Sequence, residues 1–179
     1  MSGSTTLHVL FLCTHNSARS IMAEAMLNHW GTGRVRGYSA GSHPSGQIQS
    51  MALAVLDHWN IPTNNLRSKN WDEFAQPAAP AMDLVVTVCD QAAGEMCPIW
   101  PGGPLKAHWG VEEPGALAAG QPPEAALDLF MQVAIKLRRR IQRFLDLPLA
   151  TLDARTLKQE LDRIGHMDEQ DDEGKSNHE

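Results

Sequence analysis

The chain has 179 residues, of which 42% are hydrophobic, a length that fits one domain with a substantial core. No apolar run approaches the roughly 18 residues of a membrane-spanning helix, and the first residues, MSGSTT, lack the basic and apolar segments of a signal peptide. The net charge of −6 is concentrated in residues 166–179, so the rest of the chain is close to neutral, which argues against a nucleic-acid-binding protein.

Predicted strands and helices alternate along the chain, a pattern that predicts an α/β fold with a parallel sheet. Apolar runs predict strands, and apolar residues at helical spacing predict helices. The predicted strands are 7–13, 34–41, 81–89 and the short, ambiguous 106–111, and the predicted helices are 20–30, 47–61, 123–147 and 151–165, the last capped by Thr151 or Asp153. We expect a domain over 7–147, a C-terminal helical extension over 148–165 and a disordered acidic tail over 166–179.

Two of the predicted strands end in cysteine, at Cys13 and Cys89. Ligands of parallel α/β sheets bind outside the carboxyl ends of the strands, so both thiols are expected at the binding edge. With no targeting segment we expect a cytoplasmic protein, where cysteines stay reduced unless they do redox work. Three cysteines also make a poor disulfide framework, which favours reactivity or burial.

The segment CTHNSARS, residues 13–20, places an arginine six residues after Cys13. A loop between a strand end and a helix N-terminus directs backbone N–H groups inward, an arrangement suited to a tetrahedral oxyanion. Arg19 adds a planar fork of donors, and the same positive surroundings favour the nucleophilic thiolate of Cys13. Ser20 could donate a further hydrogen bond to the sulfur, and Asn16 tolerates a left-handed backbone.

A structural interpretation of the same residues is also open. A lone cysteine after an apolar run is often a buried small hydrophobic residue, and a cysteine and an arginine six residues apart also occur by chance. The strand before the loop, the helix after it and the polar residues between favour an oxyanion-binding thiolate.

Several motifs together resemble one family. VLFLCTHNSARSIMAEA is similar to the signature of the low-molecular-weight tyrosine phosphatase superfamily, and more closely to its arsenate reductase branch. The similarity continues through YSAGSHPSG, DLVVTVCDQAAGEMCP and HWGVEEPGA, and covers roughly residues 7 to 146. It implies a four-stranded parallel sheet flanked by helices, with an oxyanion loop formed by Thr14, His15, Asn16, Ser17, Ala18 and Arg19.

The resemblance also implies a relay of three thiols. Cys13 would attack arsenate, Cys89 would resolve the adduct and release arsenite, and Cys97 would carry the disulfide to the surface. An external reductant, thioredoxin or glutaredoxin with glutathione, would complete the cycle, with no bound cofactor or metal. Cys89 and Cys97 could instead be packing residues, and their eight-residue separation requires the segment between them to bend.

The superfamily has an Asp-Pro general acid where this chain has Glu113 before Pro114. Glutamate can perform the same protonation, although a solvent-facing loop acid is the alternative, and for the neighbouring Glu112 it is the better interpretation. Some members bind potassium beside the loop, at positions that match Asn16, Glu24, Ser39 and Lys69. A lysine there would supply the positive charge itself, so we expect no potassium, unless Lys69 is simply exposed.

The sequence therefore predicts an arsenate reductase, expected to be monomeric, for which phosphate and sulfate would be competing oxyanions. The alternative is a phosphatase for phosphotyrosine or a small phosphoester, although no aromatic residue follows Glu113-Pro114 as it does in phosphatases. A non-enzymatic oxyanion or redox sensor could use the same loop. The arginine cluster 138–140 is expected on a solvated face, or else as a docking patch for an acidic reductant.

Overall fold

The computed structural model describes residues 6–90, 100 and 102–167. Its centre is a four-stranded sheet in the order β2-β1-β3-β4, in which every pair of neighbours is parallel. The strands are β1 (Leu7–Cys13), β2 (Val35–Gly41), β3 (Leu84–Thr87) and β4 (Leu105–His108). The predicted α/β class and the four-stranded parallel sheet are therefore confirmed.

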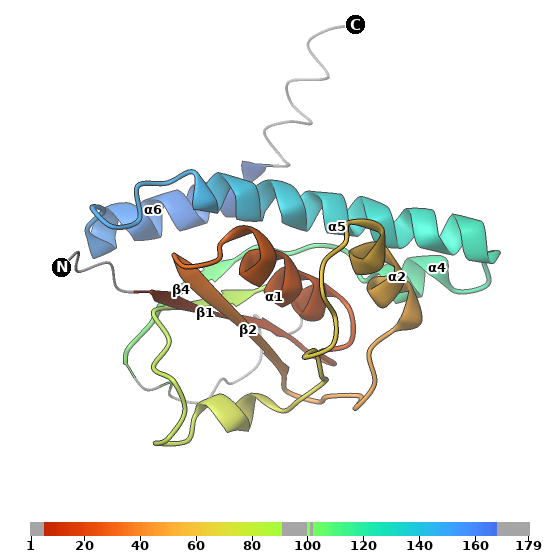
Figure 1. Ribbon diagram of the computed structural model, residues 1–179, viewed down its shortest axis with the longest axis horizontal. Helices are drawn as coiled ribbons and strands as arrows, with labels where there is room; N and C mark the ends of the chain where they lie inside the picture. The colour runs from red at the N-terminus through yellow and green to blue at the C-terminus, as the bar shows by residue number, and fades with distance from the viewer. Residues whose placement is uncertain (1–5, 91–99, 101, 168–179) are drawn as a thin grey trace, which may run out of the picture.

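Helices cover the sheet and form the outer layers (Figure 1). The longer ones are α1 (Arg19–Trp30), α2 (Ser50–His58), α5 (Pro123–Leu145) and α6 (Ala154–Gly165). They pack on one face of the sheet, whereas the 3₁₀ helix η1 (Trp71–Phe74) contributes to the core of the opposite face. None of the helices in the described ranges is long and apolar enough to cross a membrane.

The alternation of side chains along β1 divides the core between the two faces. Val9 and Phe11 belong to the larger cluster under the helices, and Leu10 and Leu12 belong to the smaller cluster with Trp71. Because β1 is buried on both sides, its sequence LHVLFLC is almost continuously apolar.

Several element boundaries differ from the predicted ones. β3 begins at Leu84 rather than at residue 81, and α2 covers Ser50–His58 rather than 47–61. Asn60, with a φ of 57°, lies beyond the end of α2 in the left-handed region. The short helices η1 and α4 (Pro114–Ala118) were not predicted, because neither is long enough to show a helical repeat.

The C-terminal helix α6 packs into the same core as the rest of the domain. Leu161 is fully buried, and its carbonyl oxygen accepts a 3.0 Å hydrogen bond from the indole of Trp109. The side chain of Asp153 accepts from the backbone N–H of Thr156, which confirms one of the two predicted caps. The division of the chain at residue 147 stays a prediction, and residues 168–179 of the predicted tail lie outside the described residues.

The expectation of a solvated arginine face on α5 is wrong for two of the three arginines. Arg138 lies over the rings of Trp30 and Trp59, at 4.8 and 5.1 Å from their centroids. Arg140 is 3% exposed and donates to the carbonyl oxygen of Gly110 at 2.9 Å. Only Arg139 within the cluster is exposed, because α5 turns its two neighbours toward the body of the protein.

Candidate active site

The strand order places the site at the point where the chain reverses direction across the sheet. From β1 the chain moves outward to β2 and then returns to the other side of β1 as β3. Crevices outside the carboxyl ends of such strands are the usual ligand sites of α/β sheets. Cys13 ends β1, and Cys89 follows β3 by two residues, so both predicted thiols lie at this edge.

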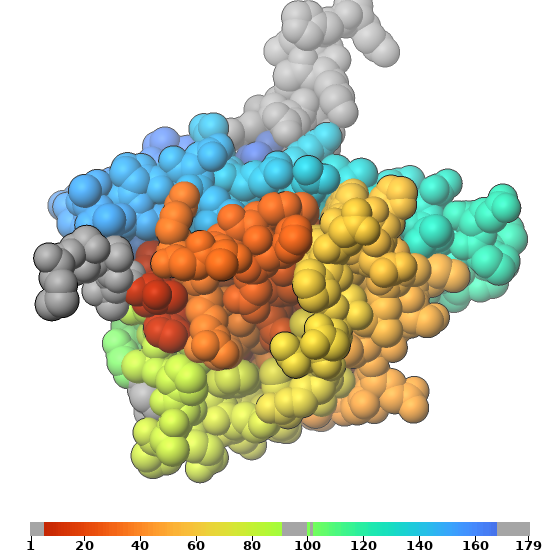
Figure 2. All heavy atoms as spheres, viewed as in Figure 1, coloured from red at the N-terminus to blue at the C-terminus, as the bar shows by residue number. Residues whose placement is uncertain are grey.

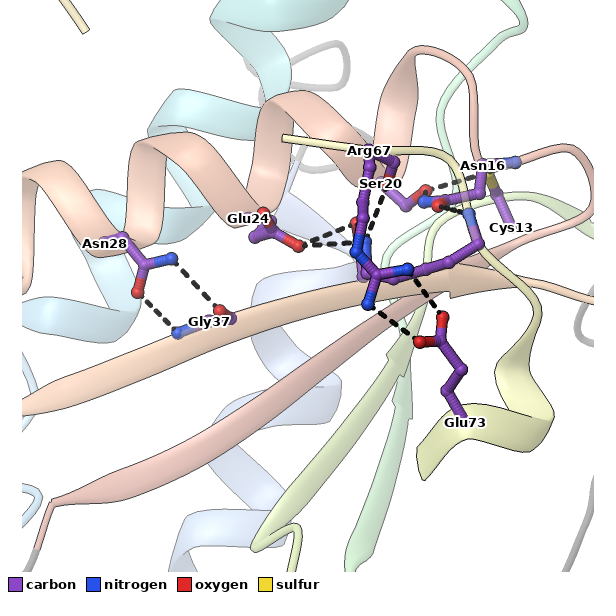
Figure 3. A network of polar contacts seen from close by, with 10 residues as sticks. Cys13, Asn16, Ser20, Glu24, Asn28, Gly37, Arg67 and Glu73 are labelled. Carbon is purple, nitrogen blue, oxygen red and sulfur yellow. Dashed lines mark hydrogen bonds and ion pairs between the residues drawn. The ribbon is translucent and has the colours of Figure 1, made fainter. Parts of the chain in front are cut away.

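The loop after β1 wraps around the sulfur of Cys13 (Figure 3). The backbone N–H of Asn16 donates to Cys13 Sγ at 3.3 Å, and Ser20 Oγ lies 3.0 Å from the same sulfur. The side-chain amide of Asn16 donates to Ser20 Oγ at 2.7 Å, which fixes the serine beside the thiol. Asn16 has a φ of 47°, which confirms the predicted left-handed conformation.

A small cavity of about 150 Å³ opens above this loop. It is lined by Cys13, His15, Ser17, Ala18, Arg19, Gln49 and Glu113. The predicted Thr14 and Asn16 are buried beside it and are not part of its lining. The cavity thus brings together the predicted nucleophile and the predicted anion-binding arginine, both from the loop after β1, with the predicted acid from the segment before α4.

Arg19 is held by the loop that follows β4. Its Nη1 donates to the carbonyl oxygen of Val111 at 3.0 Å, in the loop that follows β4. The backbone therefore fixes one corner of the guanidinium, which has further N–H donors in the same plane. Glu112 in the same loop lies at the surface, as expected, and pairs with Lys136 of α5 at 2.9 Å. That hydrogen bond holds the pKa of Glu112 below its ordinary value.

Glu113 is both a cavity residue and the N-cap of α4. Its Oε1 accepts from the backbone N–H of Gly115 at 3.0 Å, and its Oε2 accepts from that of Ala116. These bonds fix the carboxylate in the geometry of a helix cap. Pro114 occupies the first turn of this helix, where the missing N–H costs nothing.

Cys89 lies next to the same loop, and the residue is 2% exposed. Its Sγ is 3.6 Å from Thr14 Oγ1, the residue that follows Cys13. The backbone reflects this proximity, because Val88 N–H donates to the carbonyl oxygen of Leu12 across the two strands. Cys97 lies outside the described residues.

Lys69 is buried behind the loop and is not an exposed residue. Its Nζ lies 3.5 Å from Glu24 Oε1 and 3.4 Å from Ser39 Oγ, and its backbone N–H donates to the side chain of Asn16. Ser39 also donates to Glu24, so the four residues predicted as loop support form one network (Figure 3). The segment 59–70 carries Lys69 to this position (yellow in Figures 1 and 2). It follows α2 in the chain and ends beside Gly41, the last residue of β2.

Burial moves both charged groups of this network toward their neutral forms. Desolvation raises the pKa of Glu24, although the ammonium of Lys69 opposes the change. Desolvation likewise lowers the pKa of Lys69, against the attraction of Glu24. Among the described residues, no three His, Cys, Asp or Glu side chains come together in a way that would hold a metal ion.

Comparison with known proteins supplies the family. A family described as "low molecular weight phosphotyrosine protein phosphatase" matches residues 8–162. The chain belongs to this family.

Relatives within the phosphatase family include arsenate reductases. One from Bacillus anthracis (strain CDC 684 / NRRL 3495) is 35% identical over 136 residues, which cover 76% of this chain and 92% of that protein. A solved structure described as an arsenate reductase in the intermediate state is 25% identical, with a TM-score of 0.60, and covers 78% of this chain and 97% of its own. The thioredoxin-dependent arsenate reductase of Corynebacterium glutamicum is 26% identical, with a TM-score of 0.52 over 76% of this chain and 62% of its own.

The structure adds a cavity residue to this family member that sequence reasoning missed. Gln49 lines the cavity and donates through Nε2 to Ser17 Oγ at 3.0 Å and to Glu113 Oε1 at 3.3 Å. It lies far along the chain from Cys13, immediately before α2, and no motif in the sequence marks it. Gly41 was also missed: a Cβ there would lie 2.5 Å from the carbonyl oxygen of Thr14, so only glycine lets β2 approach the loop.

Proposed function

We propose that this protein reduces arsenate to arsenite. The observation that carries the proposal is the second buried thiol, Cys89, which lies beside Thr14 of the loop that surrounds Cys13. Phosphoryl hydrolysis through Cys13 and Arg19 has no use for a second thiol at this edge, whereas reduction requires one. Curated relatives such as the one from Bacillus cereus (strain 03BB102), which is 33% identical over 76% of this chain, are arsenate reductases.

In the first step the thiolate of Cys13 attacks the arsenic of a bound arsenate. A sulfur–arsenic bond forms, and an arsenic–oxygen bond breaks as the departing oxygen takes up a proton and leaves as water. Arg19 and the loop N–H groups neutralise the negative oxygens, and Ser20 supports the sulfur from 3.0 Å. Glu113, in the wall of the same cavity, is the proposed source of the proton.

In the second step the thiolate of Cys89 attacks the sulfur of Cys13. A disulfide bond forms and the sulfur–arsenic bond breaks, with its electron pair remaining on arsenic, which leaves as arsenite. Arsenic gains two electrons and the two sulfurs lose two. Cys97 is the proposed thiol that then takes over the disulfide, and an external thiol protein, thioredoxin or glutaredoxin, would reduce it. The named thioredoxin dependence of the Corynebacterium glutamicum relative makes thioredoxin the first reductant to test.

Arsenite formation tests the proposal directly. We expect the reduced full-length protein to turn over arsenate with either the thioredoxin or the glutaredoxin system. Cys89→Ser should abolish turnover but retain slow hydrolysis of an aryl phosphate, and Cys13→Ser should abolish both. Cys97→Ser should make about one arsenite per protein and then stop.

Loss of arsenite formation is the result that would overturn the proposal. If neither reductant system supports turnover while phosphate release is robust and unchanged in Cys89→Ser, the protein is a phosphatase and Cys89 is a packing residue. Tight binding of oxyanions with neither reaction would instead indicate a sensor that uses the same loop.

A further inference from the structure

Among the lining residues of the anion cavity, Gln49 forms a bridge between two others. Its amide nitrogen donates on one side to Ser17 Oγ, at 3.0 Å, and on the other to Glu113 Oε1, at 3.3 Å. Ser17 belongs to the loop that surrounds the nucleophile, and Glu113 lines the cavity from the start of α4. The amide therefore joins the two walls of the cavity with a pair of hydrogen bonds.

Two further contacts hold Gln49 in this place. Its backbone N–H donates to the carbonyl oxygen of Ser17 at 2.9 Å, which ties the start of α2 to the loop. The side chain also packs closely against α4, because a Cβ built on Gly115 would lie 2.5 Å from Gln49 Oε1. Gly115 thus leaves the space that the glutamine amide occupies.

The cavity is small and has no aromatic residue in its lining, in the part of the chain that the structure describes. Its volume is about 150 Å³. A tetrahedral oxyanion with four bare oxygens can sit between Cys13 and Arg19 without disturbing the amide bridge. The organic group of a phosphate ester that leaves the cavity between Ser17 and Glu113 would displace Gln49 from both partners.

We propose that Gln49 determines the specificity of the site by bridging Ser17 and Glu113, so that the site prefers bare tetrahedral oxyanions to their organic esters. This inference rests on the proposed function, since it names the class of substrate that the same site takes. Binding of an ester would break the hydrogen bonds of the Gln49 amide to Ser17 and Glu113, and this loss would lower the affinity for the ester.

Binding of inorganic phosphate and of phenylphosphonate to the reduced full-length protein tests the inference without any turnover. We expect the wild-type protein to bind phosphate at least about tenfold more tightly than phenylphosphonate in titration calorimetry. Gln49→Ala should narrow that ratio by about tenfold, the effect of one net hydrogen bond, mainly through tighter phenylphosphonate binding. Circular dichroism and thermal melting check that the variant is folded.

Gly115→Ala is the second variant, because it keeps the glutamine but would place a Cβ 2.5 Å from Gln49 Oε1 and 3.0 Å from Glu113 Oε2, which disturbs the contact between the two side chains. It should narrow the ratio in the same direction. An unchanged ratio in both variants, or an equal loss of affinity for both ligands, would overturn the inference and make Gln49 a support of the loop. Failure of the proposed function is a separate result, because absence of arsenite leaves the two binding constants and their ratio measurable.

Discussion

Lys69 Nζ lies 3.5 Å from Glu24 Oε1 in the interior of the protein, where only 8% of the lysine side chain and 11% of the glutamate side chain are exposed. Ser39 completes the set from β2, and Asn16 connects it to the loop around Cys13. A buried charge pair of this kind stabilises the folded protein little more than an apolar pair would, but removal of one charge leaves the other buried without its partner and destabilises the protein strongly.

Lys69→Met should lower the free energy of unfolding by about 3 to 5 kcal/mol near neutral pH, because it leaves the carboxylate of Glu24 buried with Ser39 as its remaining side-chain partner. Urea denaturation measures the change. Lys158→Met removes the exposed partner of Asp162 and should cost at most about 1 kcal/mol. The double variant Glu24→Gln/Lys69→Met should recover part of the loss, and a double variant as unstable as the sum of its parts would show that the two groups are not coupled.

The pH dependence of this penalty follows from the raised pKa of Glu24. A group whose pKa is raised by folding stabilises the protein fully below its unfolded value of 4.5, and this contribution is lost as the pH rises through the folded pKa. Removal of the lysine charge raises that pKa further, so the penalty of Lys69→Met should grow between about pH 4.5 and pH 7. Unfolding curves at the two pH values measure it; a penalty independent of pH would mean that Glu24 does not titrate in this range.

Ser20→Ala removes a hydroxyl that lies 3.0 Å from Cys13 Sγ and accepts from the amide of Asn16. A hydrogen bond to a charged group is worth about 1.5 to 3 kcal/mol, so we expect the alkylation of Cys13 by iodoacetamide, and the turnover of arsenate, to slow by about ten- to a hundredfold. Ser45→Ala, which changes an exposed serine, is the control. Alkylation at the wild-type rate would show that Ser20 does not act on the sulfur.

The arginine cluster on α5 offers two neighbouring residues with opposite expectations. Arg138 covers the rings of Trp30 and Trp59, whereas Arg139 is exposed. Arg138→Ala should cost about 1 to 2 kcal/mol of stability through the lost cation–π contacts and packing, and Arg139→Ala less than about 0.5 kcal/mol. Thermal and urea unfolding measure the stability of the two variants. Equal losses of stability would show that the contacts of Arg138 with the two tryptophan rings do not stabilise the protein.

Truncation after residue 147 tests the place of α6 in the domain. It removes Leu157, Leu161 and Ile164 from the core and takes away the hydrogen-bond acceptor of the Trp109 indole. We expect the shortened protein to be destabilised by several kcal/mol and to bind a dye for exposed apolar surface. Truncation after residue 167 keeps α6 and should unfold at the temperature of the full chain. Equal stability of both truncated proteins would mean that 148–165 is a separable extension.

The sheet and the loop could be predicted from the sequence because each depends on a local pattern. LHVLFLC is apolar enough to indicate a strand buried on both faces, and CTHNSAR contains the polar residues that the turn into α1 needs. Contacts between distant segments could not be predicted in this way. Gln49 reaches the cavity only because α2 returns toward the loop. Arg138 and Arg140 contact distant residues although the exposed Arg139 lies between them, and three consecutive arginines look alike in the sequence.

The strand order also determines at which step of the proposed redox cycle the backbone has to rearrange. Neighbouring strands lie about 4.8 Å apart, and a disulfide requires Cα atoms within about 7 Å. Cys13 ends β1, and Cys89 lies two residues beyond the end of the adjacent strand β3, so the proposed disulfide between them would need only a limited rearrangement of the backbone. The proposed arsenite-releasing step would therefore take place without a large movement of the sheet, and any large movement would follow the departure of arsenite.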